Sequence, residues 1–294
     1  MNNKHPFLVE KEPQKPLISL DLLNSLPQRI VYPVPTKTVP SLSVACFAED
    51  IIICKGLQQS GRWEVFDSEE YFLSNLFTRP LDQEYRYFLD FGSNLGLFSL
   101  LLASKGNWKG IAVEALFGSA IEFNLFANKL QDKVRVEKVA LASDGIGYVH
   151  MKFHANNPGS STAVGASETE GHMKVPKMTI DMVVEKYEKE GFIPRGVEFD
   201  YVKLDIEGFE VKALKGATKL LEQRRVKLWQ IELIHHISEA GDDPKDVIRM
   251  LNQNGYTVFW GKDKTRKITP ETLEIKGWND AYAFRNDLLS QSQI

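Results

Sequence analysis

The chain has 294 residues, of which 43% are hydrophobic and 26% charged, an ordinary composition for a folded protein with a sizeable core. Its formal net charge of −3 supplies no attraction for nucleic acid, so we predict no nucleic-acid partner. The apolar run at residues 95–103 is too short to cross a bilayer, so no membrane partner is expected. Cys46 and Cys54 lack C-x-x-C spacing, which argues against a disulfide scaffold or thiolate zinc site and makes the cytoplasm the expected compartment.

Residues 1–84 are expected to precede the main domain. Residues 1–40 are rich in proline with one short apolar patch at residues 17–26, so we expect a partly ordered arm. The first sixteen residues lack the apolar stretch of a signal peptide. Residues 42–47 and 51–54 are apolar segments on either side of a short turn and predict a hairpin. Asp67 followed by Glu70 resembles a capping arrangement for a helix. Residues 41–84 would then be a hairpin and a helix that pack on the core.

The stretch YFLDFGSNLGLFSLLLA, residues 87–103, reads as a buried strand, a glycine turn and a helix. These are the parts of a nucleotide-binding βα unit, in which glycine lets the backbone approach a ligand closely. Asp90 ends the strand, where a ligand's amine or hydroxyl could be held. The spacing is D-x-G-x-N-x-G, with Asn94 in place of the middle glycine of a dinucleotide fingerprint. The turn therefore indicates an adenosine-containing ligand other than NAD.

Strands and helices alternate regularly after this unit. We predict helices at residues 95–105, 119–130, 180–190, 209–221 and 245–253, and strands at 110–114, 134–139, 147–153, 201–206, 226–234, 256–260 and 281–285. A small-residue segment at residues 155–171 is expected to be a mobile loop. This alternation predicts an α/β fold with a doubly wound, mostly parallel sheet over residues 85–290, preceded by an N-terminal extension.

Glu114 ends the second strand of this domain, where an acid can accept hydrogen bonds from both ribose hydroxyls. The alternative is an acid that stabilises a helix N-terminus. We favour the ribose role because the glycine turn lies upstream. Ala140 and Leu141, after the third strand, are expected either to flank an adenine ring or to belong to the core.

A second polar group follows the strand in YVKLDIEGFEVKALKGA, residues 201–217. Asp205 and Glu207 lie at the carboxyl end of that strand, the edge at which open α/β sheets bind ligands. Each could be a general base, a sulfonium partner or a metal ligand, or could simply cap the next helix. His235 follows the next strand and could accept a proton, although a loop histidine without a function is as common. We predict no metal site, since His150 and His154 alone are a weak metal signal.

Five segments together resemble the FkbM family of S-adenosylmethionine-dependent (class I) methyltransferases: FLDFGSNLG, the acid of AVEA, VALASDGIG, YVKLDIEGFEVKALKGA and QIEL. The likeness extends from about residue 63 to residue 232. It implies a Rossmann-like methyltransferase fold with a seven-stranded sheet and a reversed final hairpin. One departure is Ala115, where the family often has proline after the acid. The resemblance also implies that S-adenosyl-L-methionine is held by Asp90, Gly92, Ser93, Asn94, Gly96, Glu114 and Ala115, with Ala140 and Leu141 beside the adenine.

The sequence therefore predicts methyl transfer to a hydroxyl oxygen of a small molecule or sugar. Asp205 is the first candidate for the base, with Glu207 and His235 behind it. The alternative is a noncatalytic protein that binds an S-adenosyl ligand or acts as a scaffold. An NAD-dependent oxidoreductase is disfavoured by the missing middle glycine.

Overall fold

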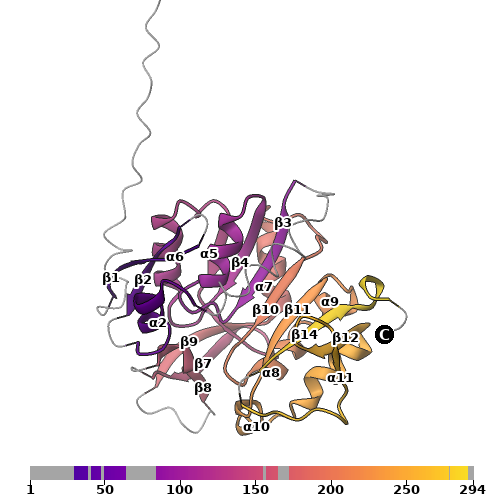
Figure 1. Ribbon diagram of the computed structural model, residues 1–294. Helices are drawn as coiled ribbons and strands as arrows, with labels where there is room; N and C mark the ends of the chain where they lie inside the picture. Colours follow the sequence, from indigo (N-terminus) through magenta and orange to yellow (C-terminus); the bar gives the residue numbers. More distant parts are fainter. Residues whose placement is uncertain are drawn as a thin grey trace, which may run out of the picture.

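The computed structural model describes residues 30–38, 41–47, 50–63, 84–154, 157–164, 172–277 and 279–290. Within these ranges the largest element is a sheet of 8 strands in the order β13-β12-β14-β11-β10-β3-β4-β5. Figure 1 shows helices on both sides of this sheet. The predicted doubly wound, mostly parallel α/β fold is confirmed.

The centre of the sheet is parallel and buried. Every residue of β3 is buried, as expected for a strand covered on both faces. Further along the chain, β14 runs antiparallel between β11 and β12. The strands are β3 (Arg86–Phe91), β4 (Trp108–Val113), β5 (Val134–Glu137), β10 (Tyr201–Leu204), β11 (Leu228–Leu233), β12 (Tyr256–Trp260), β13 (Arg266–Ile268) and β14 (Asn279–Arg285).

The expected count of seven strands is one too low. Seven of the strands form the predicted arrangement, with the reversed strand near one edge. The eighth is β13, which pairs antiparallel with β12 and forms the outer edge. Its sequence, Arg-Lys-Ile, is too short and too basic to show the alternation of a strand, and only the isoleucine is buried. The pairing with β12 is a tertiary contact that local sequence does not predict.

Successive residues of each central strand face two different cores. Leu89 and Phe91 of β3 face the core formed with α7 (Ile180–Lys189), α8 (Glu210–Lys215), α9 (Thr218–Glu222) and α11 (Lys245–Gln253). Phe88 faces the other core, formed with α2 (Ile53–Ser60), α5 (Leu97–Ser104) and α6 (Gly118–Ala127). The predicted helix at residues 209–221 is divided at Gly216 into α8 and α9, and Gly216 packs so closely against Ala142 that there is no room for a Cβ.

The N-terminal segments form a hairpin that differs from the expected one. Strand β2 (Ser43–Phe47) pairs antiparallel with β1 (Ile30–Pro35), which lies inside the segment expected to be an arm. The expected partner, residues 51–54, instead runs into helix α2, because Asp50 Oδ1 accepts hydrogen bonds from Ile52 N and Ile53 N and starts the helix. The helix expected near Asp67 lies outside the described residues.

The hairpin docks on helix α6 through two buried or half-buried amide side chains. Ala45 N donates to Asn124 Oδ1 over 2.7 Å, and Ser43 N donates to Asn128 Oδ1 over 2.8 Å. Asn124 also donates from Nδ2 to Leu95 O, 2.9 Å away in the glycine turn. Figure 1 shows β1 and β2 beside α6. The hairpin is therefore tied to the segment that carries the glycines.

A second, smaller sheet has the order β6-β9-β7-β8. Its strands are β6 (Ala140–Leu141), β7 (Gly147–Lys152), β8 (Thr162–Val164) and β9 (Met173–Met178). The predicted extra strand is confirmed as β7. The segment expected to be a mobile loop contains a short 3-10 helix, Pro158–Ser160, and β8. Strand β9 was not predicted, because its sequence MKVPKM contains a proline and two lysines that obscure a strand pattern.

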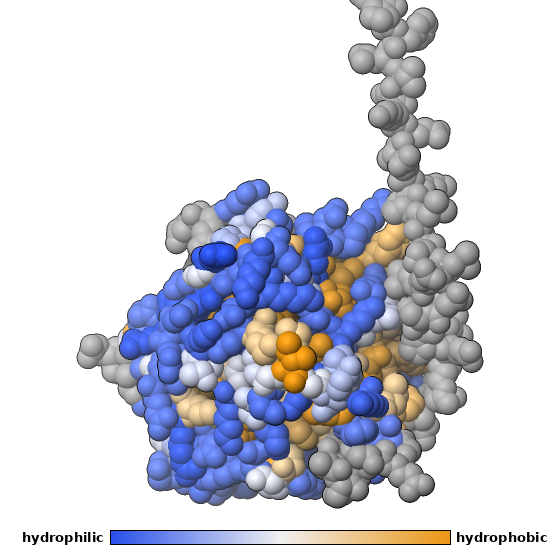
Figure 2. Space-filling view, turned by 180° about the vertical axis from the view of Figure 1, so that it is seen from behind, coloured by the Kyte–Doolittle hydropathy of each residue, from blue (hydrophilic) through white to orange (hydrophobic). Residues whose placement is uncertain are grey.

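No helix among the described residues is long and apolar enough to cross a membrane. On the face of the molecule in Figure 2, hydrophilic residues predominate and hydrophobic ones gather in small patches.

Candidate functional site

A cavity of about 550 Å³ opens at the carboxyl ends of β3, β4, β10 and β11. This is the edge at which open α/β sheets bind ligands. The small sheet contributes Val149 and Met151 to its wall, and α2 contributes Ile53. Of the predicted site residues, the cavity brings together Gly92, Ser93, Asn94, Glu114, Ala115, Ala140, Leu141, Asp205 and Glu207.

The glycine turn touches the loop that follows β10. Gly92 has φ +75°, and a Cβ built on it would lie 1.7 Å from Asp205 O, so no other residue fits. Gly96 also has a positive φ, +79°, and packs against Ile121 of α6 behind the turn. Asn94 itself is left-handed, with φ +51°. The turn is therefore held against the second predicted polar segment at backbone contact.

Asp90 supports the turn from below and does not line the cavity. Its side chain is 1% exposed, and Oδ2 accepts hydrogen bonds from Ser99 N and Ser99 Oγ of α5. Its Oδ1 is buried without a hydrogen-bond partner among the described residues. Burial raises the pKa of Asp90, and the nearby Lys203 charge opposes that rise. Oδ1 is thus an available acceptor beneath the turn.

Glu114 joins the two loops at the ends of β3 and β4. Its Oε2 accepts from Asn94 N at 2.9 Å, and its Oε1 accepts from Leu116 N and Phe117 N at 2.8 and 3.3 Å. Burial raises the pKa of Glu114, and these N–H donors oppose the rise. An ionised carboxylate has about four acceptor sites, so one remains for a ligand. The carboxylate lines the cavity wall, where the sequence predicted a ribose contact.

A polar row crosses the sheet beneath the cavity and joins Asp90, which the sequence assigned to the site, to two residues that it did not assign. Asp90, Lys203 and Gln230 are in register on the adjacent strands β3, β10 and β11, and Lys203 and Gln230 line the cavity. Gln230 Nε2 donates to Asp280 Oδ2 over 2.6 Å. A lysine and a glutamine within otherwise apolar strands were the sequence signal for this row, because buried polar residues need partners.

Lys203 is the cation of this row. Its Nζ lies 2.5 Å from Asp205 Oδ2 and 5.1 Å from the Phe98 ring centre. Burial alone would lower the pKa of Lys203, but the charges of Asp205 and Asp90 raise it above its ordinary value, so the ammonium group stays protonated. Asp205 is therefore held by a buried charged partner at the cavity floor.

Acidic side chains gather at the same end of the cavity. Asp205, Glu207 and Glu232 each place one carboxylate oxygen within 4.8 Å of the other two, close enough that a divalent cation could bind between them. Burial and the Asp205 charge raise the pKa of Glu207 to about 8 and also raise that of Glu232. Glu207 has a left-handed backbone, with φ +55°, in the turn between β10 and α8.

Glu210 is a third acidic residue at this end of β10; helix α8 begins without a side-chain cap hydrogen bond, the alternative role that the sequence offered for Asp205 and Glu207. Glu210 is fully buried, and its Oε1 accepts hydrogen bonds from Ile206 N and Gly208 N. Burial raises the pKa of Glu210 to about 7. Glu210 thus fixes the turn between β10 and α8 that carries Asp205 and Glu207.

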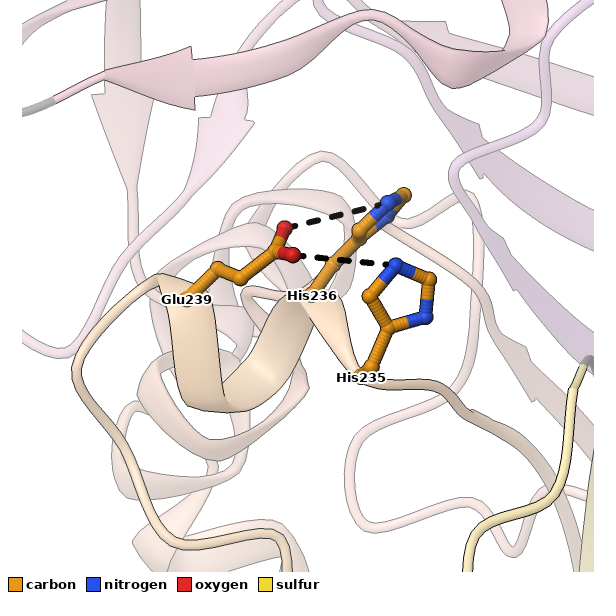
Figure 3. A group of neighbouring side chains, drawn as sticks. All are labelled: His235, His236 and Glu239. Atoms are coloured by element: carbon orange, nitrogen blue, oxygen red, sulfur yellow. Dashed lines mark ion pairs between the residues drawn. The ribbon is translucent and has the colours of Figure 1, made fainter.

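The structure places His235 outside the cavity. Its side chain is 59% exposed at the start of α10 (His236–Glu239), and Nε2 lies 3.7 Å from Glu239 Oε1. Figure 3 shows the ring turned toward Glu239. His235 therefore has no position from which to take a proton in the cavity, and we withdraw it as a candidate base.

The fold and this site define a Rossmann-like methyltransferase. The methyltransferase FkbM domain model matches residues 90–258, and the chain belongs to that family. The predicted family is thereby confirmed, and with it the assignment as a methyltransferase.

Among named proteins, the chain is similar to methyltransferase sdnD of Sordaria araneosa, with 27% identity over 70% of this chain and 86% of that protein. It is also similar to the hexuronic acid methyltransferase AglP of Haloferax volcanii, with 34% identity over 29% of this chain and 30% of that protein. Among solved structures it is similar to the human methyltransferase 10 domain containing protein, with a TM-score of 0.42 and 15% identity over 83% of this chain and 90% of that one.

Proposed function

We propose that the chain uses S-adenosyl-L-methionine to methylate a hydroxyl oxygen of a small molecule or sugar. The observation that carries the proposal is the backbone contact between Gly92 and Asp205, which joins the glycine turn and the acidic group in one cavity. The name of the hexuronic acid methyltransferase supports a sugar as one acceptor class. The absence of a nucleic-acid partner remains a prediction that rests on the net charge of −3.

The residues around the turn fit this cofactor. Asn94 lines the cavity, and its Oδ1 is a buried acceptor without a hydrogen-bond partner among the described residues, suited to a ligand with an amine. Asp90 Oδ1 is a second such acceptor beneath the turn, behind the cavity wall. Glu114 has one acceptor site left for a ribose hydroxyl. The adenine would lie against a part of the cavity wall formed by small and apolar side chains, those of Ala115, Ala140 and Leu141. When bound, S-adenosyl-L-methionine supplies a methyl group on a positively charged sulfur.

The acidic end of the cavity would handle the acceptor. Transfer to oxygen is a displacement in line with the bond that breaks, so holding the hydroxyl at the right distance and angle contributes much of the rate. Asp205 would take the hydroxyl proton onto its carboxylate, which the 2.5 Å ion pair with Lys203 holds in position. Glu207 and Glu232 lie beside it and would bind other hydroxyls of the acceptor. The chain's own contribution is thus orientation and one proton transfer.

Calorimetric titration with S-adenosylhomocysteine tests the cofactor half. We expect micromolar binding by the wild type, and weaker binding by Glu114→Gln, which keeps the shape of the side chain but removes its charge. Glu222→Gln is the matched control, because Glu222 is exposed at the end of α9, far from the turn in sequence. A wild type that does not bind would refute the cofactor proposal.

Turnover across a panel of sugars and small hydroxyl compounds tests the acceptor half. Asp205→Asn should lower turnover about 100-fold, a typical contribution of a general base, with the affinity for S-adenosylhomocysteine unchanged. Equal turnover in a folded Asp205→Asn variant would remove Asp205 as the base. Cofactor binding without consumption over the whole panel would favour the noncatalytic alternative.

A further inference from the structure

Three side chains of types that commonly bind metals, those of His235, His236 and Glu239, lie together at α10, outside the cavity. Nε2 of His235 lies 3.7 Å from Oε1 of Glu239, and Nε2 of His236 lies 3.9 Å from Oε2 of the same carboxylate. The two imidazole rings are 4.4 Å apart between centres. Figure 3 shows one nitrogen of each ring facing the same carboxylate, which lies to one side of both rings. Each residue places one donor atom within 4.8 Å of the other two.

The local backbone explains this convergence. His235 has helical φ and ψ at the start of α10, so Glu239 follows it at i+4 and follows His236 at i+3. Residues at these spacings lie on one side of a helix. Among the described residues, the ion pairs of Glu239 are with these two histidines and with no lysine or arginine. Its carboxylate is therefore available to a cation.

A carboxylate lies near the other ring nitrogen of His236. Nδ1 lies 3.4 Å from Glu207 Oε2, and the Glu207 side chain is only 12% exposed. A histidine that binds a metal through one nitrogen commonly donates the other N–H to a carboxylate, which fixes the ring. Gly208 packs against the backbone of His236, where a Cβ would come within 2.7 Å of the His236 carbonyl. His236 is thus placed by two neighbouring residues.

We propose that His235, His236 and Glu239 bind a divalent transition-metal ion of the Zn²⁺ type. Two imidazoles and one carboxylate are a donor set that Zn²⁺ uses, with a fourth position left to water. Bond lengths of about 2.1 Å require the donors to move closer together. His235 and Glu239 have that freedom, because their side chains are 59% and 66% exposed.

The ion would act on the cavity through Glu207. Glu207 lines the cavity wall and faces His236 from the other side. A metal on Nε2 keeps the proton of His236 on Nδ1, which then donates to Glu207 and holds that carboxylate in place. This site departs from the sequence-based expectation of no metal. It stands on its own side chains and does not depend on the proposed cofactor or acceptor.

The carboxylates inside the cavity are the rival binding place. Asp205, Glu207 and Glu232 offer oxygen donors only, which suit Mg²⁺ and Ca²⁺ better than Zn²⁺. Lys203 also lies 2.5 Å from Asp205 and already supplies a positive charge there. A test with Zn²⁺ therefore separates the two groups by their chemistry.

The experiment measures Zn²⁺ binding to the full chain after chelator treatment, by calorimetry, and follows Co²⁺ substitution by its visible absorption. We expect one ion per chain and a tetrahedral Co²⁺ spectrum. His235→Ala and Glu239→Gln should each weaken binding by at least about tenfold and abolish that spectrum. His150→Ala and Glu222→Gln are matched controls elsewhere in the chain and should bind as the wild type does.

Two results would overturn the proposal. One is Zn²⁺ affinity that is equal in wild type, His235→Ala and Glu239→Gln. The other is binding that Glu232→Gln abolishes while His235→Ala retains it, which would assign the ion to the cavity. Thermal unfolding of each variant reports on the fold, which substitution at these exposed positions should not disturb. S-adenosylhomocysteine titration of the same samples reports separately on the cofactor proposal.

Discussion

Replacing Gly92 by alanine tests the contact on which the site depends. The added Cβ would lie 1.7 Å from Asp205 O and 3.1 Å from Ile206 Cγ2. Real Cβ atoms do not approach a backbone oxygen this closely, so the glycine turn and the loop after β10 must separate by more than an ångström. Gly191 provides the matched control, because its φ of +72° is close to the +75° of Gly92 while nothing lies within 4 Å of its Cβ position.

The two substitutions separate two costs. Alanine in the left-handed region costs about 1 kcal/mol, and Gly191→Ala should lose that amount of unfolding free energy. Forcing an extra carbon into a packed position costs about 1–3 kcal/mol more, so Gly92→Ala should lose about 2–4 kcal/mol. A shift of about 1 Å in the turn would also lower methyl transfer about 100-fold. Losing one hydrogen bond to a charged ligand group, about 1.5 kcal/mol, corresponds to about tenfold weaker binding of S-adenosylhomocysteine.

Urea unfolding followed by circular dichroism gives the free energies, and calorimetry gives the ligand affinity. The reasoning would be refuted if Gly92→Ala matched Gly191→Ala in stability and kept the wild-type affinity for S-adenosylhomocysteine. That result would mean that the turn and the acidic loop move independently.

Two further changes probe the buried charges. Burial raises the pKa of Glu210 from 4.5 to about 7, so its stabilising contribution is present below about pH 4.5 and is lost as pH rises through about 7. Between about pH 5 and about pH 8, the wild type should lose up to about 3 kcal/mol of unfolding free energy relative to Glu210→Gln. If the difference in unfolding free energy between wild type and variant stayed constant over this range, the raised pKa would be contradicted. Lys203→Met leaves the carboxylates beside it without their cation and should lower the unfolding free energy, measured in urea, by about 3–5 kcal/mol. Lys219→Met is the control: it breaks an exposed ion pair and should lower the unfolding free energy by at most about 1 kcal/mol. Equal losses in the two lysine variants would show that Lys203 is not a buried counter-charge.

The central sheet was readable from sequence because its strands and helices have clear apolar periods. Helix α11 was predicted with the bounds that the structure has, residues 245–253, and β12 was predicted just as closely. The N-terminal hairpin was assigned the wrong partner, since residues 51–54 are apolar enough for a strand. Asp50 decides otherwise through two side-chain hydrogen bonds that start α2. The hydrogen bonds of one aspartate side chain thus favour a helix where the apolar pattern predicts a strand.

The sequence predicted residues of the cavity wall but not the polar residues at the floor of the cavity. Gly92 and Glu114 were chosen because a glycine turn after one strand and an acid at the end of the next occur together, and the structure places both in the cavity wall. Lys203 and Gln230 were not assigned, because their meeting with Asp90 depends on register between strands far apart in the chain. His235 was chosen because it follows β11, but the backbone turns into α10 at that point and directs the ring outward. Position at a strand end does not fix side-chain direction.

The family model begins at residue 90, yet the folded unit begins earlier. Helix α6 presents Asn124 and Asn128 to the backbone of β2, and Val44 and Cys46 of that strand are almost fully buried. A shortened chain that kept only the family segment would lose β2 and expose to water the apolar side chains of the same core, such as Ile121 and Leu125 of α6, which would favour aggregation. Anyone who exchanges domains between relatives, or trims this protein for expression, should therefore keep residues 30–47 together with helix α6, on which they dock.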